Sequence, residues 1–319
     1  MQPKAKTVSI AVPVFNEEAN IENFYQEVVK YMEPLPYNFE LIFVDDGSTD
    51  ASPFILNRLV QKDSRVRALI FASNYGHQRA LTCGLDYAAG DAVITMDGDM
   101  QHPPSMLPLL IAKWEEGFEV VQTIRNATEG TSWLKNFTSE MFYKLINALS
   151  NIKITPGGSD FRLLDKKVAQ SFKLFRERAR FIRGMISSIG YNQTQVEFVA
   201  PKRFAGVSKF SPRKMLHFAL DGITAYSKTP LRLAFYAGLI LGAVSILMIG
   251  HVLYIKFFTE EAVPGWATIS TSILVLGGLQ LIGLGIIGEY VGRIFEEVKE
   301  RPLYLIKADL RGGENRNGQ

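Results

Sequence analysis

Residues 92–104 read Ala-Val-Ile-Thr-Met-Asp-Gly-Asp-Met-Gln-His-Pro-Pro, an apolar run that ends in two carboxylates, Asp97 and Asp99, with Gly98 between them. A strand ending in this way delivers both acids to its carboxyl end, where ligands of open α/β sheets bind. The two acids and the amide oxygen of Gln101 suit Mg²⁺ or Mn²⁺ carrying a substrate diphosphate, which the side-chain-free Gly98 lets approach. The alternative is a surface turn, since Asp-Gly pairs are common there.

Strand and helix patterns alternate before this motif. We expect strands over residues 8–14, 41–44, 66–71 and 92–96, and helices over 21–32, 54–60 and 77–89. A helix over 103–116 and a strand over 118–124 follow. This alternation predicts a largely parallel, doubly wound α/β sheet. Basic amphipathic helices over 133–149 and 172–189 would lie on a membrane surface or pack on the sheet.

Two later segments, residues 233–255 and 266–288, contain no Lys, Arg, Asp or Glu. Each has about 23 residues, against the roughly 20 that a membrane-spanning helix needs. Basic residues flank the pair, so the positive-inside rule places both termini in the cytoplasm. A buried hairpin of a soluble protein is the alternative. Gly238-xxx-Gly242 and Gly288-xxx-Gly292 would allow close helix approach, within one subunit or in a homo-oligomer.

The expected organisation follows from these patterns. It is a cytoplasmic catalytic domain over 1–200, a juxtamembrane segment over 201–230, transmembrane helices over 231–258 and 266–292, a short external loop over 259–265, and a cytoplasmic tail over 293–319. The polar residues 1–7 lead straight into a strand, so no cleaved signal peptide is expected. The only cysteine, Cys83, excludes an internal disulfide and a Cys-rich metal site.

Polar turns also follow the first two expected strands, as Pro13-Val-Phe-Asn-Glu-Glu18 and Asp45-Asp-Gly-Ser48. A carboxylate there can accept a hydrogen bond from a base or a ribose hydroxyl, and Gly47 would let the backbone curl round the sugar. The alternative is an Asx turn that caps the next helix through Ser48 or Asp50. No GxGxxG motif follows the first expected strand, which argues against a dinucleotide-binding oxidoreductase, and no GxxxxGK[ST] motif is present, which argues against a P-loop nucleotidase.

Four motifs resemble glycosyltransferase family 2 in order and spacing over residues 7 to about 225. They are Val12-Pro-Val-Phe-Asn-Glu-Glu18, Val44-Asp-Asp-Gly-Ser48, Asn74-Tyr-Gly76 with Ala80 and Gly84, and Asp97-Gly-Asp-Met-Gln-His-Pro-Pro104. The hairpin and Arg203-Phe-Ala-Gly-Val-Ser-Lys-Phe210 are similar to the polyprenyl-phosphate branch, which includes undecaprenyl-phosphate (bactoprenol) glucosyltransferases and relatives of dolichyl-phosphate mannosyltransferases. The resemblance implies a GT-A (Rossmann-like) fold, a nucleotide-sugar donor, a divalent metal and inversion at the anomeric carbon.

The resemblance also implies roles for single residues. The nucleotide would be bound by Pro13, Asn16, Glu17, Asp45, Asp46, Gly76, Asp97 and Gly98, and the metal by Asp97, Asp99 and Gln101. The acceptor phosphate and the donor diphosphate would be bound by Arg125, Lys135, Ser139, Arg203 and Lys209. Lys135 stands where an arginine is usual, and a lysine contacts phosphate only as a point charge. For Arg203 and Lys209 the alternative is surface charge near anionic lipid heads.

The implied catalytic residues are Asp99, Asp160 and Arg162, and Asp160 falls where many family members carry a general base. A sugar hydroxyl acceptor needs such a base. A phosphate monoester has a second pKa of about 6 and is already a dianion at neutral pH. We therefore expect Asp160 to orient Arg162 or the acceptor pocket, with a base role as the alternative.

The expected function is transfer of a hexose, glucose from UDP-glucose, onto undecaprenyl phosphate at the cytoplasmic face of a bacterial inner membrane, for later glycan or lipopolysaccharide modification. GDP-mannose or UDP-4-formamido-arabinose are alternative donors. A processive polysaccharide synthase is disfavoured because Gln-x-x-Arg-Trp is absent, and an inactive scaffold because the acidic motif is intact. A separate flippase is expected to act on the product, and no nucleic-acid partner is expected.

Overall fold

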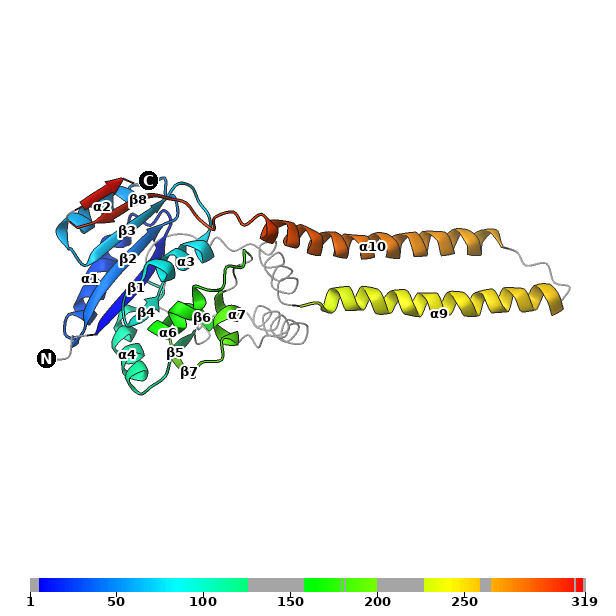
Figure 1. Cartoon of the computed structure of the whole chain (residues 1–319), viewed down its shortest axis with the longest axis horizontal. Helices are drawn as coiled ribbons and strands as arrows, with labels where there is room; N and C mark the ends of the chain where they lie inside the picture. Colours follow the sequence, from blue (N-terminus) through cyan, green and yellow to red (C-terminus); the bar gives the residue numbers. More distant parts are fainter. Residues whose placement is uncertain are drawn as a thin grey trace. The chain divides into compact units, whose positions relative to one another are not determined.

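The computed structural model describes residues 6–125, 158–178, 180, 182–199, 227–258, 265–312 and 314–317. The chain divides into two compact units, one made of residues 1–147, 152–215 and 301–319, the other of residues 148–151 and 216–300. The first unit contains the β-sheet and the second contains two long apolar helices (Figure 1).

The sheet has nine strands within the described ranges, in the order β7-β5-β6-β4-β1-β2-β3-β8-β9. The strands are β1 (Thr7–Val14), β2 (Asn38–Asp45), β3 (Val66–Phe71), β4 (Ala92–Thr95), β5 (Val120–Arg125), β6 (Gly158–Asp165), β7 (Gln193–Phe198), β8 (Ile306–Arg311) and β9 (Glu314–Asn317). The four central strands β4, β1, β2 and β3 are parallel, as the strand–helix alternation predicts. The flanking pairs β4–β6, β5–β6, β3–β8 and β8–β9 are antiparallel, so the whole sheet is mixed.

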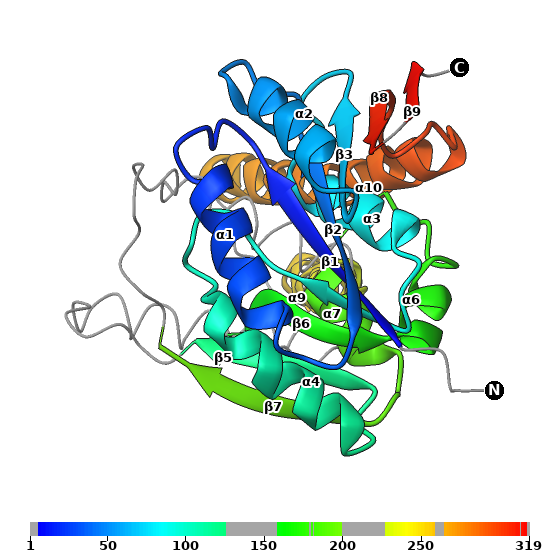
Figure 2. The same ribbon diagram turned by 90° about the vertical axis from the view of Figure 1, so that its left-hand side faces the viewer.

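Helices cover both faces of the sheet (Figure 2). They are α1 (Ile21–Met32), α2 (Ser52–Lys62), α3 (His77–Tyr87), the short 3₁₀ helix η1 (Pro104–Met106), α4 (Leu107–Glu115), α6 (Lys166–Phe172) and α7 (Ile182–Ser188). Alternate residues of β2 point to opposite faces. Leu41 and Phe43 pack in the core with α1, α2 and α4, whereas Ile42 and Val44 pack with α3. Both faces of the central strands are therefore buried.

One predicted helix is corrected, and strand β6 was not predicted. The helix expected over residues 172–189 is interrupted, because α6 ends at Phe172 and α7 begins at Ile182. Arg180, between them, lies over the Phe172 ring and donates from Nε to Thr82 Oγ1 of α3 at 3.1 Å, so a contact to another helix replaces a continuous helix here. The strand β6 was not expected, since Asp160 and Arg162 give it charges at alternate positions.

The tail predicted over residues 293–319 is also corrected, because its last part belongs to the sheet. β8 pairs antiparallel with β3 and carries β9 at its outer edge. Just before β8, the Tyr304 ring stacks on Phe71 of β3 with ring centroids 5.1 Å apart. The Tyr304 hydroxyl donates to Asp86 of α3 at 2.8 Å. The chain thus returns to its first unit after the apolar helices.

The second unit contains α9 (Thr229–Phe258) and α10 (Trp266–Val298). By length and composition both are candidate membrane spans, with mean hydropathy 2.2 over Thr229–Ile255 and 1.5 over Val275–Val298. Their large apolar side chains are mostly exposed, as expected of a surface that lipid would cover. A Cβ added at Gly238, Gly242, Gly288 or Gly292 would meet no atom of the described residues within 4 Å, so these glycines make no close helix contact within that part of the chain.

Candidate functional site

The turns after β1 and β2 are bound to each other by side chains. Asn16 has a left-handed backbone (φ 55°), donates its N–H to Ser48 Oγ at 2.9 Å and accepts from the Thr49 N–H at 2.9 Å. Asp45 is fully buried and accepts from the Ser48 N–H at 3.3 Å. Burial raises the pKa of Asp45. Three expected nucleotide residues, Pro13, Asn16 and Asp45, therefore lie in one neighbourhood, where Pro13 is paired with Val44 in the β1–β2 register.

Asp50 and Glu17 complete this turn region. The Asp50 carboxylate accepts from the N–H groups of Glu18 at 3.2 Å and Ser52 at 2.9 Å. The expected Asx turn is therefore present, although the N-cap of α2 is Ala51. Glu17 donates its N–H to Ser52 Oγ at 3.0 Å, and its carboxylate accepts from the Asn20 amide at 2.6 Å. The turn after β1 is therefore joined to Ser52, the first residue of α2, by a hydrogen bond.

Asp46 connects β2 to the loop before α3. Its carboxylate accepts from the N–H groups of Tyr75 at 2.7 Å and Gly76 at 2.9 Å. Burial raises the pKa of Asp46. Gly47 has φ 72°, and a Cβ there would lie 2.6 Å from the Ser73 carbonyl carbon. Position 47 needs glycine because its backbone lies in close contact with the β3–α3 loop. Asp46 forms its two hydrogen bonds to the same loop.

The acidic loop after β4 holds the three residues predicted to bind metal. One carboxylate oxygen of Asp97, Oδ1, is buried and accepts no hydrogen bond from the described residues. Asp99 accepts from the Gln101 N–H at 3.1 Å. A Cβ at Gly98 would lie 3.1 Å from a Val14 methyl, so this glycine packs closely on β1.

This donor set fits a divalent cation. A buried carboxylate oxygen that accepts no hydrogen bond from the described residues, such as Asp97 Oδ1, keeps lone pairs that a metal would satisfy. No cluster of three or more His, Cys, Asp or Glu suited to a metal occurs in the part of the chain that the structure describes. Two carboxylates and an amide leave coordination positions open, which is the arrangement Mg²⁺ takes when substrate phosphates supply further ligands.

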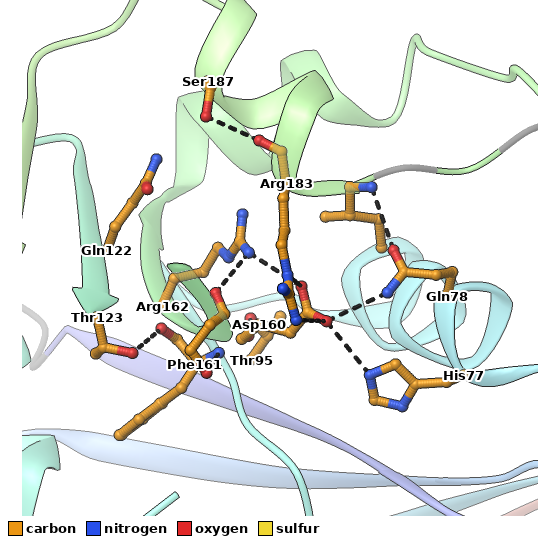
Figure 3. Close-up of polar contacts among 12 residues, drawn as sticks. His77, Gln78, Thr95, Gln122, Thr123, Asp160, Phe161, Arg162, Arg183 and Ser187 are labelled. Carbon is orange, nitrogen blue, oxygen red and sulfur yellow. Dashed lines mark hydrogen bonds and ion pairs between the residues drawn. The ribbon is translucent and has the colours of Figure 1, made fainter. Parts of the chain in front are cut away.

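Asp160 of β6 is the centre of a buried ionic cluster (Figure 3). Its carboxylate accepts from Arg183 of α7 through Nε at 3.0 Å and Nη2 at 3.1 Å, and from Arg162 Nη2 at 3.1 Å. The Gln78 amide of α3 donates to it at 3.2 Å. Burial alone would raise the pKa of Asp160, but the charge of Arg183 and the other donors hold it well below its usual range.

Arg162 is almost entirely buried, with 2% of the residue exposed. Nη2 also donates to the Ser159 carbonyl at 2.7 Å, while Nε and Nη1 are buried without a partner among the described residues. Burial lowers the pKa of Arg162 to about 10. The predicted association of Asp160 with Arg162 is therefore present in the structure, and it extends to Arg183.

Two histidines at this site were not predicted. His77, the first residue of α3, places Nε2 3.4 Å from Asp97 Oδ1 and 3.6 Å from Asp160 Oδ2. Burial lowers its pKa, but the two carboxylates outweigh this and raise it to about 9. His102 places Nδ1 2.8 Å from the Asp97 main-chain nitrogen and Nε2 2.6 Å from Ser159 Oγ.

The sequence signals for these missed residues were weak. His102 stands within the acidic motif and His77 directly after Asn74-Tyr-Gly76, but neither spacing specifies a contact. Arg183 reads only as one cation of an amphipathic helix, and Gln78 carries no signal. Their roles depend on α3 and α7 meeting at β6, a tertiary arrangement.

The predicted phosphate-binding residues are mostly outside the described part of the chain. Lys135, Ser139, Arg203 and Lys209 all lie in ranges that the structure does not describe. Arg125 ends β5, opposite Phe198 in the β5–β7 register, and its Nε is buried without a partner among the described residues.

The Rossmann-like sheet, with acidic loops at the carboxyl ends of its parallel strands, is the arrangement of a GT-A glycosyltransferase. The chain belongs to glycosyltransferase family 2. The family model "Glycosyl transferase family 2" matches residues 9–172, and the model "GtrB C-terminal hairpin" matches residues 229–294. The predictions of a GT-A fold, a glycosyltransferase and a carboxy-terminal helical hairpin are confirmed.

Several relatives match along nearly their whole length. An SfII prophage-derived bactoprenol glucosyl transferase of Shigella flexneri is 43% identical over 305 residues, covering 96% of this chain and 99% of the relative. A prophage bactoprenol glucosyl transferase homolog of Escherichia coli K12 is 42% identical, covering 94% and 98%. The uncharacterized glycosyltransferase YkcC of Bacillus subtilis is 42% identical, covering 97% and 95%.

Proposed function

We propose that this protein transfers glucose from UDP-glucose to undecaprenyl phosphate, with inversion at the anomeric carbon. The observation that carries the proposal is the convergence of two acidic groups from neighbouring strands, Asp97 after β4 and Asp160 on β6. His77 Nε2 lies 3.4 Å from the first and 3.6 Å from the second, and two arginines hold Asp160. The first suits a cation and a diphosphate, and the second suits a site that orders an anionic acceptor. The bactoprenol glucosyl transferase relatives support the sugar and the lipid.

The residues that would hold the metal are Asp97, Asp99 and Gln101. When bound, Mg²⁺ or Mn²⁺ would neutralise charge on the departing diphosphate. The chain's own groups set the geometry: Asp45 would accept hydrogen bonds from the base, and the Asn16–Ser48–Thr49 contacts would fix the turn around the nucleoside. Arg203 and Lys209 would add positive charge at the diphosphate.

In the reaction, an oxygen of the acceptor phosphate forms a bond to the anomeric carbon while the bond to the diphosphate oxygen breaks. UDP leaves, and the product is a polyprenyl-phosphate sugar. The attacking oxygen of a phosphate dianion carries no proton, so no base is required. Arg125, Lys135 and Ser139 would bind and orient this phosphate.

Asp160 acts in this scheme as an orienting group. A carboxylate that accepts four hydrogen bonds from Arg183, Arg162 and Gln78, with a pKa held low, is a poor proton acceptor. Its charge instead compensates Arg162 in the buried layer between β6 and α7. Loss of that charge would release both arginines from their positions.

The membrane arrangement belongs to the same proposal. α9 and α10 cross the inner membrane, residues 259–265 lie outside, and the catalytic unit faces the cytoplasm, where nucleotide sugars are made. The basic residues on either side of the apolar helices support this orientation. The protein works as a homo-oligomer, and a flippase carries its product to the outer leaflet.

The test is a transfer assay with the full-length protein in detergent or nanodiscs. Undecaprenyl phosphate is supplied with UDP-glucose, GDP-mannose or UDP-4-formamido-arabinose, each with Mg²⁺ or Mn²⁺. The expected product is undecaprenyl-phosphate glucose with inverted anomeric configuration. Transfer only from one of the other donors would contradict glucose, and no transfer to the lipid from any donor would overturn the acceptor.

A further inference from the structure

His102 joins two segments of the site that come from different strands. It is buried, with 7% of the residue exposed. Nδ1 lies 2.8 Å from the main-chain nitrogen of Asp97, and Nε2 lies 2.6 Å from Ser159 Oγ. Asp97 belongs to the acidic loop after β4, whereas Ser159 directly precedes Asp160 on β6. One imidazole ring therefore contacts both halves of the site.

The direction of these hydrogen bonds is fixed by their partners. The Asp97 main-chain nitrogen can only donate, so Nδ1 of His102 accepts. The ring proton is then on Nε2, and Ser159 Oγ accepts it. Ser159 Oγ also accepts from the Phe161 N–H at 3.2 Å, which fixes the hydroxyl against the strand. The bridge thus runs from the Asp97 backbone through the ring to the backbone of β6.

Aromatic packing holds the ring in this orientation. The imidazole stacks on Phe161 with ring centroids 5.1 Å apart and an interplanar angle of 21°. Phe198 of β7 meets the imidazole edge-on, with centroids 6.0 Å apart, and it also contacts Phe161 edge-on at 5.9 Å. A phenylalanine at position 102 would fill the same apolar space. Packing accounts for an aromatic ring at position 102 but not for its nitrogens. The two ring nitrogens instead form hydrogen bonds to the Asp97 backbone and to Ser159.

We propose that His102 is a positioning residue that couples the cation and donor loop to the acceptor segment. Through Nδ1 it sets the backbone of Asp97, and through Nε2 it sets Ser159 and the adjacent Asp160. The inference rests on the proposed function, which assigns the cation and donor to the loop after β4 and the acceptor to the segment around Asp160. The two ring nitrogens should therefore affect different steps. Loss of the Nδ1 contact should weaken the binding of cation and nucleotide, whereas loss of the Nε2 contact should slow the transfer.

Two substitutions separate the two nitrogens. His102→Asn keeps an acceptor close to the Nδ1 position and loses the donor toward Ser159. His102→Gln keeps a donor close to the Nε2 position and loses the acceptor toward Asp97. Ser159→Ala removes the far end of the bridge without touching the ring. Ser171→Ala is the matched control. It removes a serine hydroxyl on α6 that forms a hydrogen bond of 2.7 Å with the Tyr191 hydroxyl.

The first measurement is binding of Mn²⁺ with UDP to the full-length protein by calorimetry, which needs no acceptor. His102→Gln should weaken this binding about 10-fold or more, the loss expected for a buried hydrogen bond to the loop, whereas His102→Asn and Ser159→Ala should stay within about 3-fold of the parent. Equal weakening in both histidine variants would overturn the proposal, since simple loss of packing would not distinguish the two nitrogens.

The second measurement is glucose transfer to undecaprenyl phosphate. His102→Asn and Ser159→Ala should each lower kcat about 10-fold with the KM for the donor little changed, and the double variant should be no slower than either single one. Multiplicative losses would overturn the bridge. Ser171→Ala should match the parent, and the melting temperatures of all variants are recorded.

The outcomes also separate the two proposals. If the parent binds Mn²⁺ and UDP but does not transfer glucose to the lipid, the proposed function fails while the binding contrast between the histidine variants still decides the bridge. If the histidine variants do not fold, Ser159→Ala decides: a lower kcat with unchanged UDP affinity supports the bridge, and an unchanged kcat overturns it.

Discussion

Arg67 of β3 and Asp309 of β8 form a paired ionic contact between residues 242 positions apart in the chain, with Nε to Oδ1 at 2.8 Å and Nη2 to Oδ2 at 2.6 Å. Only 14% of the Arg67 side chain and 24% of the Asp309 side chain are exposed. The Arg67 guanidinium also lies over the Tyr87 ring of α3, 4.6 Å from its centroid. The carboxy-terminal strand is therefore fixed to the sheet by side chains as well as by its backbone.

Asp309→Ala should lower the free energy of unfolding of the sheet unit by about 1 to 3 kcal/mol, because Arg67 loses its partner in a mostly buried position. Thermal unfolding of the full-length protein in detergent measures this. Lys307→Ala, an exposed neighbour on β8, is the control and should change stability by less than about 0.5 kcal/mol. Equal effects of the two substitutions would contradict the importance of the ion pair.

Gly47→Ala should be strongly destabilising, by about 3 kcal/mol, because the new Cβ would meet the Ser73 backbone and the φ of 72° is unfavourable for alanine. Gly117→Ala is the matched control: its φ is 98°, but no atom lies within 4 Å of the added Cβ. It should cost only about 1 to 2 kcal/mol. Similar melting temperatures for the two variants would show that the backbone contact at Gly47 is unimportant.

Stability should fall in acid partly through Asp63. Hydrogen bonding from Arg65 lowers the pKa of Asp63 to about 2. A carboxyl group with a depressed folded-state pKa stabilises the fold fully above its unfolded value of about 3.9, and this stabilisation is lost as the pH falls toward 2. Asp63→Asn should therefore cost about 1 to 2 kcal/mol at pH 7 and less at pH 3. Parallel stability–pH curves for parent and variant would refute this assignment.

Asp160→Asn should reduce transfer by a factor that is nearly constant from pH 6 to pH 9, because the carboxylate orients cations and removes no proton. The variant should also unfold more easily, by about 3 kcal/mol, since Arg162 and Arg183 lose a buried counter-charge. Rate against pH, measured at saturating substrates, is the readout. A steep loss that alkaline buffer restores would identify Asp160 as a base.

Asp99→Ala should abolish transfer while leaving the melting temperature within a few degrees of the parent, because the predicted ligand lies on a loop outside the core. Excess EDTA should abolish transfer by the parent, and added Mn²⁺ or Mg²⁺ should restore it. Full activity in the chelator would remove the metal from the proposed reaction.

The central strands and helices were predictable from local patterns. Apolar positions recur at helical spacing along α1, and β1, β2 and β4 are short, mainly apolar segments bounded by turns. The acidic loop after β4 was predictable for the same reason, since a strand end localises it. By contrast, β6 and β8 have mixed polar sequences, and their pairing depends on which edges of the sheet are free. The cations around Asp160 come from three elements, so no local spacing signals them.

The position of β8 in the chain has a consequence for how the protein is made. Its partner strand β3 emerges from the ribosome early, whereas β8 emerges only after both long apolar helices. Throughout synthesis the β3 edge therefore lacks its neighbour, and an open strand edge is a site of aggregation. The catalytic unit becomes complete only after the apolar hairpin has been translated, so the order of the gene delays assembly of the enzyme until its anchoring segment exists.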